Sequence, residues 1–138
     1  MQEEIRTEET KHISIDDFTK VEIMLGTIKS VELVEGSDKL YRLKVDFGES
    51  KEIENDDGFM KTESHVRNVL SGIRKLISVE DLTGKQFPFI TNLAPRKMMG
   101  EYSEAMILAG SEVQGGDKLE VLALMSPTAK LSNGTKLR

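Results

Sequence analysis

The side chains of this chain that could take part in chemistry are cations and hydroxyl groups rather than a recognisable catalytic set. The sequence contains no cysteine and only two histidines, His12 and His65. The histidines lack metal-ligand spacing to each other or to a carboxylate pair, and no glycine-rich phosphate loop is present. We therefore expect no catalytic residue, no metal and no cofactor, and we read both histidines as surface residues.

Lysine and arginine side chains at or near expected strands remain as the groups able to hold an anionic ligand. They can follow phosphates, with Arg favoured where two-point contact is needed. The candidates are Lys29, Lys39, Arg42, Lys44, Arg74, Lys75, Arg96 and Lys97. Taken singly, each is more simply read as an ordinary surface cation.

The net charge of −5 at first argues against an anionic partner. The charge is uneven, however: residues 1–66 hold 9 basic and 17 acidic side chains (net −8), and residues 67–138 hold 10 basic and 7 acidic (net +3). Because charges are screened over about 8 Å at physiological salt, an acidic average permits a basic face. The alternative is a solvated acidic surface that binds nothing.

Length and composition favour a single domain outside the membrane. A chain of 138 residues with 38% apolar content can build one core. No apolar run approaches the ~20 residues of a membrane span, and residues 1–11 are too polar for a secretory signal. We expect a cytoplasmic protein in which residues 1–13 are flexible.

Apolar alternation predicts five strands, at residues 20–34, 41–47, 66–73, 86–93 and 103–109. Ser14 and Ser78 each cap a short helix, the first running through Phe18 and the second ending at Gly84. Residues 49–64 show no period and are expected to form a long mobile loop. Five strands with a helix between the third and fourth is the OB-fold arrangement, so we expect an all-β five-stranded barrel.

Two segments depart from simple alternation. In residues 20–34 the apolar phase slips after Gly26, which predicts a bulge or sharp bend at that glycine. Residues 118–125 are apolar at both parities, which predicts burial of both faces. Either a second subunit covers one face or the strand is sandwiched within the monomer, and the pattern does not separate the two.

The segment that carries a resemblance is residues 92–109, which read NLAPRKMMGEYSEAMILA. It resembles the signature of the tRNA-binding domain family: Asn-Leu, a Pro, a Lys-Met or Lys-Leu pair, a Gly, then Ser and Met three apart. Other segments agree in order and spacing, and the resemblance covers roughly residues 14–138. The family includes the C-terminal domain of methionyl-tRNA synthetases, free-standing tRNA-binding proteins and an export-related chaperone.

The resemblance implies a non-catalytic tRNA-binding module acting beside a methionyl-tRNA synthetase catalytic chain. It favours Arg96 and Lys97 as phosphate contacts, Ser103 as a donor to the RNA, and Met106 as a surface for a base. Without the motif, Ser103 is equally consistent with a hydrogen bond to the backbone of its own loop. Met106 is then better interpreted as a core residue. The full RNA-binding set is Lys29, Lys39, Arg42, Arg74, Lys75, Arg96, Lys97, Ser103 and Met106.

The resemblance also implies an OB-fold domain at 14–110 and a C-terminal extension at 111–138 that pairs two copies into a homodimer. Met24 stands where the family often has Arg, and the acidic segment 49–63 lengthens a connection that is usually short. The main alternative is a protein-binding, chaperone-like OB-fold dimer with a methionine-rich patch. An oligosaccharide-binding module is a third reading, but its aromatic platform is largely missing.

Overall fold

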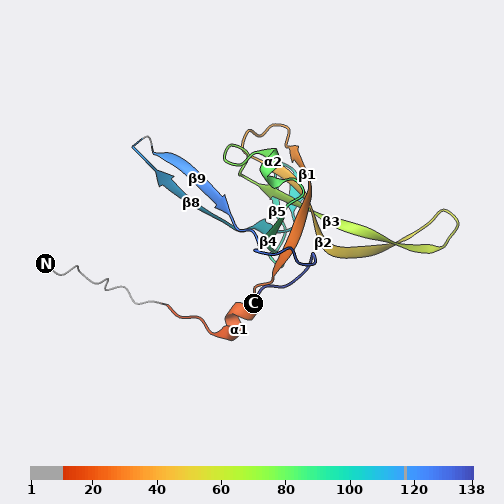
Figure 1. Ribbon diagram of the computed structural model, residues 1–138. Coiled ribbons are helices and arrows are strands. Elements are labelled where there is room, and N and C mark those ends of the chain that lie inside the picture. The colour runs from red at the N-terminus through yellow and green to blue at the C-terminus, as the bar shows by residue number, and fades with distance from the viewer. Residues whose placement is uncertain (1–10, 117) are drawn as a thin grey trace.

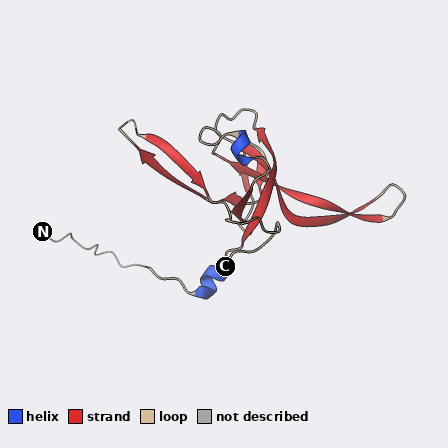
Figure 2. Ribbon diagram, in the orientation of Figure 1, coloured by secondary structure: helices blue, strands red, loops and turns tan. Residues whose placement is uncertain are grey.

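The chain folds around one antiparallel five-stranded sheet that curls into an OB-like half-barrel (Figures 1 and 2). The computed structural model describes residues 11–116 and 118–138. The elements are α1 (Ile15–Thr19), β1 (Ile23–Leu33), β2 (Tyr41–Glu54), β3 (Met60–Ser71), α2 (Val79–Leu82), β4 (Gln86–Ile90), β5 (Arg96–Met98), β6 (Glu101–Ser103), β7 (Met106–Ile107), β8 (Ala109–Gln114) and β9 (Leu119–Leu124). The sheet order is β3-β2-β1-β4-β7, while β5–β6 and β8–β9 form separate hairpins. The predicted all-β fold is confirmed.

The strand β1 pairs with β4 through its first half and with β2 through its second. A Cβ at Gly26 would lie 2.6–2.7 Å from the side chains of Phe47 and Val45, so only glycine lets β1 pass this close to the core. The bulge expected at Gly26 lies instead between Ile28 and Ser30. The glycine thus marks the close approach, and the irregular pairing follows it.

The core lies inside the curl of the sheet. Phe47 and Phe89 meet edge to face with ring centroids 5.2 Å apart. The alternating residues of β2 are buried as predicted: Tyr41, Leu43, Val45 and Phe47. Because that strand packs one face against the core, its side-chain period of two is visible in the sequence.

Two serines begin the short helices, as predicted. Ser14 forms a capping box, in which its Oγ accepts from the amide of Asp17 at 3.1 Å. Ser78 accepts from the amide of Asp81 at 3.3 Å and starts α2. Leu82 of α2 is fully buried, so this single turn closes one end of the barrel.

Residues 49–64 form a two-stranded arm that projects from the barrel (Figure 1). Strand β2 continues through Glu54, β3 begins at Met60, and the turn closes through the amide of Asn55, which donates to the Phe59 carbonyl at 2.7 Å. The predicted mobile loop is therefore wrong, and the third strand starts earlier than residue 66. Since most side chains of the arm are exposed, no alternation marks its strands in the sequence.

The last two strands of the predicted barrel are shorter than expected. Strand β4 ends at Ile90, although the Thr91 amide still donates to Glu22 O at 2.9 Å in the register that pairs Ile90 with Ile23. The fifth strand of the sheet is only β7, because Ser103 ends β6 and Ala109 already belongs to β8.

The β8–β9 hairpin stands off the barrel (Figure 2). Leu122 and Leu124 pack against the core, whereas Leu119 and Val121 on the opposite face are exposed. Of the two alternatives for this strand, a sandwich within the monomer is therefore contradicted. A second subunit on the exposed face remains a proposal.

After this hairpin the chain returns to the barrel. The amide of Leu25 donates to Thr135 O at 2.9 Å, and the amide of Gly134 donates to Leu25 O at 2.7 Å. Gly134 has φ +89°, and a Cβ there would lie 2.4 Å from the Phe47 carbonyl oxygen. This close return therefore requires glycine, and it ties the end of the chain to β1.

Candidate nucleic-acid interface

The β5–β6 hairpin presents the two cations of the signature segment. Arg96 lies opposite Ser103, and Lys97 lies opposite Tyr102. Both cations are exposed, and the Lys97 Nζ lies 5.8 Å from the centroid of the exposed Tyr102 ring. The hairpin can therefore offer two positive charges and one aromatic face to a ligand.

A shallow groove of about 540 Å³ runs beside this hairpin. Its wall is mainly apolar with one cation: Leu70, Ser71, Gly72, Leu93, Ala94, Arg96, Met98, Ser103, Ala105 and Met106. Met106 is exposed at its rim rather than held in the core. An apolar groove with an Arg at its edge suits a planar, charged ligand such as a nucleotide.

Ser103 is buried, and its hydroxyl is already used inside the protein. Its Oγ accepts from the Leu70 amide at 3.0 Å and donates to the Ala105 carbonyl at 3.0 Å. The first bond joins β6 to β3, and the second holds the chain that leads to Met106. This serine therefore sets the shape of the groove in the free protein.

The predicted cations of β2 lie on its outer face, each with a polar partner. Arg42 bonds to Glu101 through two N–H groups, at 2.8 and 2.5 Å. Lys44 Nζ donates to Asn68 Oδ1 at 3.0 Å. The Glu101 pairing raises the pKa of Arg42, and Arg42 in turn holds the pKa of Glu101 below its usual range. No local sequence pattern indicates these pairings.

A second group of predicted cations lies around the β1–β2 loop. The Arg74 Nη1 donates to Ser37 O at 2.6 Å, Lys75 pairs with Asp38 at 3.1 Å, and Lys39 is exposed in the same loop. A Cβ on Gly36 would lie 3.2 Å from the Met99 side chain, which places this loop against the β5–β6 turn. Lys29 is exposed at the β1 bulge, and no contact joins it to these cations.

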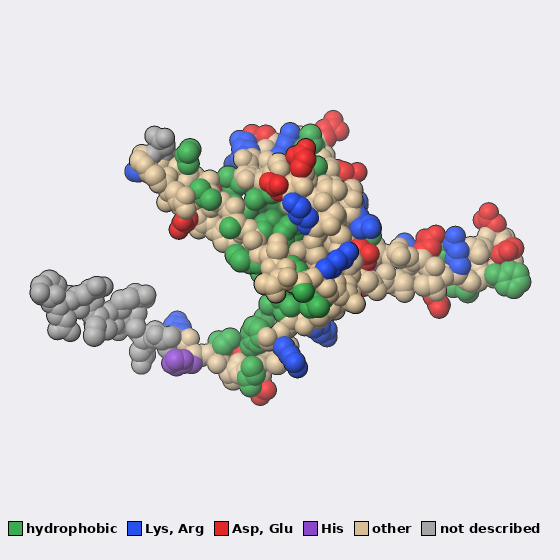
Figure 3. Space-filling model, viewed as in Figure 1, with side chains coloured by type: hydrophobic (Ala, Val, Ile, Leu, Met, Phe, Trp, Pro, Cys, Tyr) green, Lys and Arg blue, Asp and Glu red, His purple; other side chains and the backbone are tan. Residues whose placement is uncertain are grey.

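Figure 3 shows Lys and Arg side chains interspersed with acidic ones over the barrel, and further acidic side chains towards the end of the arm. Within residues 11–116 and 118–138, no cluster of three or more His, Cys, Asp or Glu side chains is arranged to hold a metal ion. No helix in these ranges is long and apolar enough to span a bilayer.

Comparison with known families identifies the chain. Residues 23–136 match the family described as "Putative tRNA binding domain". The chain belongs to this family. The match includes the β5–β6 hairpin, the groove and β2, so the tRNA-binding domain is the unit that carries all the candidate cations.

Relatives of this tRNA-binding domain include much longer enzymes. A methionine–tRNA ligase of Aromatoleum aromaticum is 40% identical over 139 residues, covering 99% of this chain and 18% of the ligase. Methionine–tRNA ligase 1 of Bacillus cereus is 42% identical over 138 residues, again with 99% and 18% coverage. The chain thus spans about 18% of the length of these two relatives.

Solved structures share the fold of this tRNA-binding domain. A MetRS-related protein from Pyrococcus horikoshii superposes with a TM-score of 0.72 at 26% identity, covering 94% of this chain and 100% of that one. The chaperone CsaA from Bacillus anthracis superposes with a TM-score of 0.65 at 25% identity, covering 93% and 100%.

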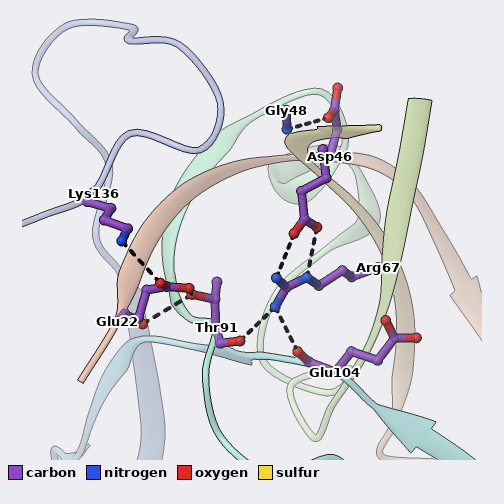
Figure 4. Close-up of polar contacts among 8 residues, drawn as sticks. Glu22, Asp46, Gly48, Arg67, Thr91, Glu104 and Lys136 are labelled. Atoms are coloured by element: carbon purple, nitrogen blue, oxygen red, sulfur yellow. Dashed lines mark hydrogen bonds and ion pairs between the residues drawn. The ribbon is translucent and has the colours of Figure 1, made fainter. Parts of the chain in front are cut away.

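One residue of this domain with several polar contacts was missed from the sequence. Arg67 bonds to Glu49 at 2.9 and 2.7 Å and donates to the carbonyls of Thr91 and Glu104 at 2.7 and 3.3 Å (Figure 4). Its guanidinium also lies 5.2 Å from the Phe47 ring centroid. A signal was available, because Arg67 shares the parity of the buried Val69 in β3. The network joins the base of the arm to the chain before and after the β5–β6 hairpin.

Proposed function

We propose that this chain is a non-catalytic tRNA-binding module that recognises the shape and backbone of folded tRNA. In this proposal it acts in the cytoplasm beside a methionyl-tRNA synthetase catalytic chain, where it raises the local concentration of tRNA. Family membership and the ligase relatives support this role. The observation that carries it is the exposed Arg96 in the wall of an apolar groove, with the exposed Lys97 next to it on β5.

The proposed contacts divide by the kind of group they offer. Arg96 and Lys97 contact phosphates, Tyr102 and Met106 offer surfaces for a base, and Ser103 holds the groove in shape. The remaining cations, Lys29, Lys39, Arg42, Arg74 and Lys75, extend the phosphate track. Tyr102 is the one exposed aromatic ring on the β5–β6 hairpin, which favours recognition of folded RNA over stacking along a single strand.

A salt titration with paired variants tests the tRNA proposal. Arg96→Ala combined with Lys97→Ala removes two phosphate contacts, so affinity for total tRNA should fall by about tenfold or more at physiological salt. The dependence of log K on log salt should also become shallower by up to about 1.5. Fluorescence anisotropy with labelled tRNA measures both quantities.

The matched control is Lys85→Ala with Lys130→Ala. These two substitutions also remove two positive charges, but from a different depression. That depression lies between the residues that follow α2 and those that follow β9. This variant should leave most of the affinity intact. Equal losses in both double variants, or a wild-type affinity that does not change with salt, would refute the proposed interface.

A second candidate function is protein binding of the chaperone type. It is favoured by the fold shared with CsaA and by the exposed methionines beside the groove, Met99 and Met106. Binding of an unfolded peptide should then survive the Arg96→Ala and Lys97→Ala changes. Loss of peptide binding and tRNA binding together would instead indicate one shared site.

We further propose that the chain forms a homodimer through the exposed face of the β8–β9 hairpin. That face carries Leu119, Val121 and Ala123, of which Val121 and Ala123 line a depression of about 330 Å³ together with residues of β8. A dimer would present two tRNA-binding faces and would cover apolar side chains that are exposed in the monomer.

A further inference from the structure

The carboxylate of Glu101 occupies the donor fork of Arg42, a side chain on the sheet face next to the groove. The Arg42 Nε and Nη2 donate to the two carboxylate oxygens at 2.8 and 2.5 Å. Both side chains are partly buried, with 24% and 30% exposed. A two-point Arg–carboxylate contact uses the same N–H fork that would receive a phosphate.

We propose that Glu101 is an intramolecular competitor that keeps Arg42 from RNA phosphates and so limits the affinity of the module. The inference rests on the proposed tRNA-binding function. It assigns Glu101 a specificity-determining role: RNA gains the Arg42 contact only where its backbone displaces the carboxylate. A weakly placed phosphate therefore gains nothing from Arg42.

Local charge supports competition. A second carboxylate, Glu32 on β1, lies 3.6 Å from the Arg42 Nη1. The guanidinium is therefore flanked by two negative groups, and Lys44, two residues along the same strand, donates to Asn68. An approaching phosphate meets a surface whose positive charge is already balanced.

The alternative is that the pair merely fastens the β5–β6 hairpin to the sheet. Three other hydrogen bonds already do so. Asn68 Nδ2 donates to Tyr102 O at 3.1 Å, the Leu70 amide donates to Ser103 Oγ at 3.0 Å, and the Glu104 amide donates to Asn68 O at 2.8 Å. Because these bonds hold the strand without Glu101, losing its charge should leave the hairpin in place.

The decisive experiment is a double-mutant cycle on tRNA binding. Glu101→Gln keeps the size of the side chain and removes its charge, so tRNA affinity should rise about fivefold to tenfold. The slope of log K against log salt should steepen by about 0.7–0.9, the contribution of one added phosphate contact. In an Arg42→Ala background the same change should give little gain, since no freed guanidinium remains.

Glu104→Gln is the matched control. It removes the same charge three residues along the chain, on the side of Arg67 rather than Arg42. It should change affinity by less than about twofold, because this charge acts on Arg67 and leaves the Arg42–Glu101 pair intact. Circular dichroism and thermal unfolding of each variant check that the fold is kept.

The outcomes separate the two claims. If wild-type protein binds tRNA but Glu101→Gln leaves the affinity unchanged or lowers it, the competitor role is wrong. The Arg42–Glu101 pair then only holds the β5–β6 hairpin against the sheet. A gain that persists in the Arg42→Ala background would also overturn the competitor role. If neither the wild type nor Glu101→Gln binds tRNA, the proposed function fails, and the inference that rests on it fails too.

Discussion

At the residue scale, the ion pair of Arg67 and Glu49 links the arm to the barrel. The hydrogen bonds from Arg67 lower the pKa of Glu49, and the positive charges of Arg67 and His65 act in the same direction. The carboxylate must be ionised to make these bonds. The pair therefore contributes its full stability above the ordinary glutamate pKa of about 4.3, and loses it as pH falls through the lower pKa of the folded state.

This linkage gives a pH-dependent prediction. Glu49→Gln should lower the free energy of unfolding by about 1–2 kcal/mol at pH 7, because a charged hydrogen-bonded partner of a partly buried Arg is lost. The difference from wild type should shrink towards pH 3, because below the ordinary glutamate pKa of about 4.3 the unfolded chain takes up a proton at Glu49 before the folded state does. Urea denaturation at both pH values measures the two differences.

The control for this prediction is Glu52→Gln on the arm. Glu52 is exposed, and no ion pair among the described residues includes it. Its effect should stay within about 0.5 kcal/mol at either pH, as for most surface changes. A Glu49→Gln difference that is equal at pH 7 and pH 3 would show that the pair does not act through its charge.

Residue types could be foreseen better than residue partners. Arg96 and Lys97 were expected at or near a strand, and both are exposed on β5. Arg42 was expected as a free cation, yet Glu101, 59 positions away, fills its donor fork. Such a pairing depends on the fold bringing β6 onto β2, and no local pattern records it. The same holds for Ser103, whose two partners are fixed by the β3–β6 contact.

At the element scale, the arm is the part of the fold that alternation did not reveal. The core half of β2 was visible because Leu43, Val45 and Phe47 face a packed interior. Beyond Gly48 the same strand has no interior to face, and its residues follow no period. The turn residues Asn55 and Gly58 were present, but a turn signal without flanking alternation does not define a hairpin.

Excision of the arm tests whether it is independent of the barrel. Residues 52–62 can be replaced by Asn-Gly, because Lys51 and Glu63 already lie opposite each other and this turn suits a two-residue hairpin. The free energy of unfolding should change by less than about 1 kcal/mol, since none of the removed residues is buried and Glu49 and Arg67 remain.

Affinity for tRNA should not fall in the excised protein. The removed segment carries four acidic side chains and one lysine, so its loss makes the surface less negative. Urea denaturation and anisotropy with labelled tRNA report the two properties on one sample. A clear loss of tRNA affinity would indicate that the arm contacts RNA, and a large loss of stability would indicate that it supports the barrel.

At the scale of the whole molecule, the arm and the β8–β9 hairpin extend from the barrel in different directions (Figure 1). The arm is acidic and therefore suited to solvent, whereas the open face of the β8–β9 hairpin is apolar and suited to contact with another apolar surface. Charge is also divided, because the acid is concentrated in the N-terminal half and the signature cations lie in the other. A negative average is therefore compatible with a basic binding face.

The proposed dimer gives a prediction at this scale. Val121 lies 41% exposed in the middle of β9, on the open face of the hairpin. Val121→Glu places a charge in the proposed interface, where its burial without a partner is unfavourable. The protein should change from dimer to monomer, which size-exclusion chromatography with light scattering measures directly.

The monomer should also bind tRNA more weakly if one tRNA contacts both copies. Two linked faces raise the effective concentration of the second contact, so its loss should lower affinity by about tenfold or more. Thr62→Glu on the exposed arm is the matched control, since it adds the same charge away from β9 and should leave the mass unchanged. A Val121→Glu protein that remains dimeric would place the interface elsewhere. A monomer with full tRNA affinity would mean that each copy binds tRNA alone, in which case pairing serves stability by covering the apolar face rather than recognition.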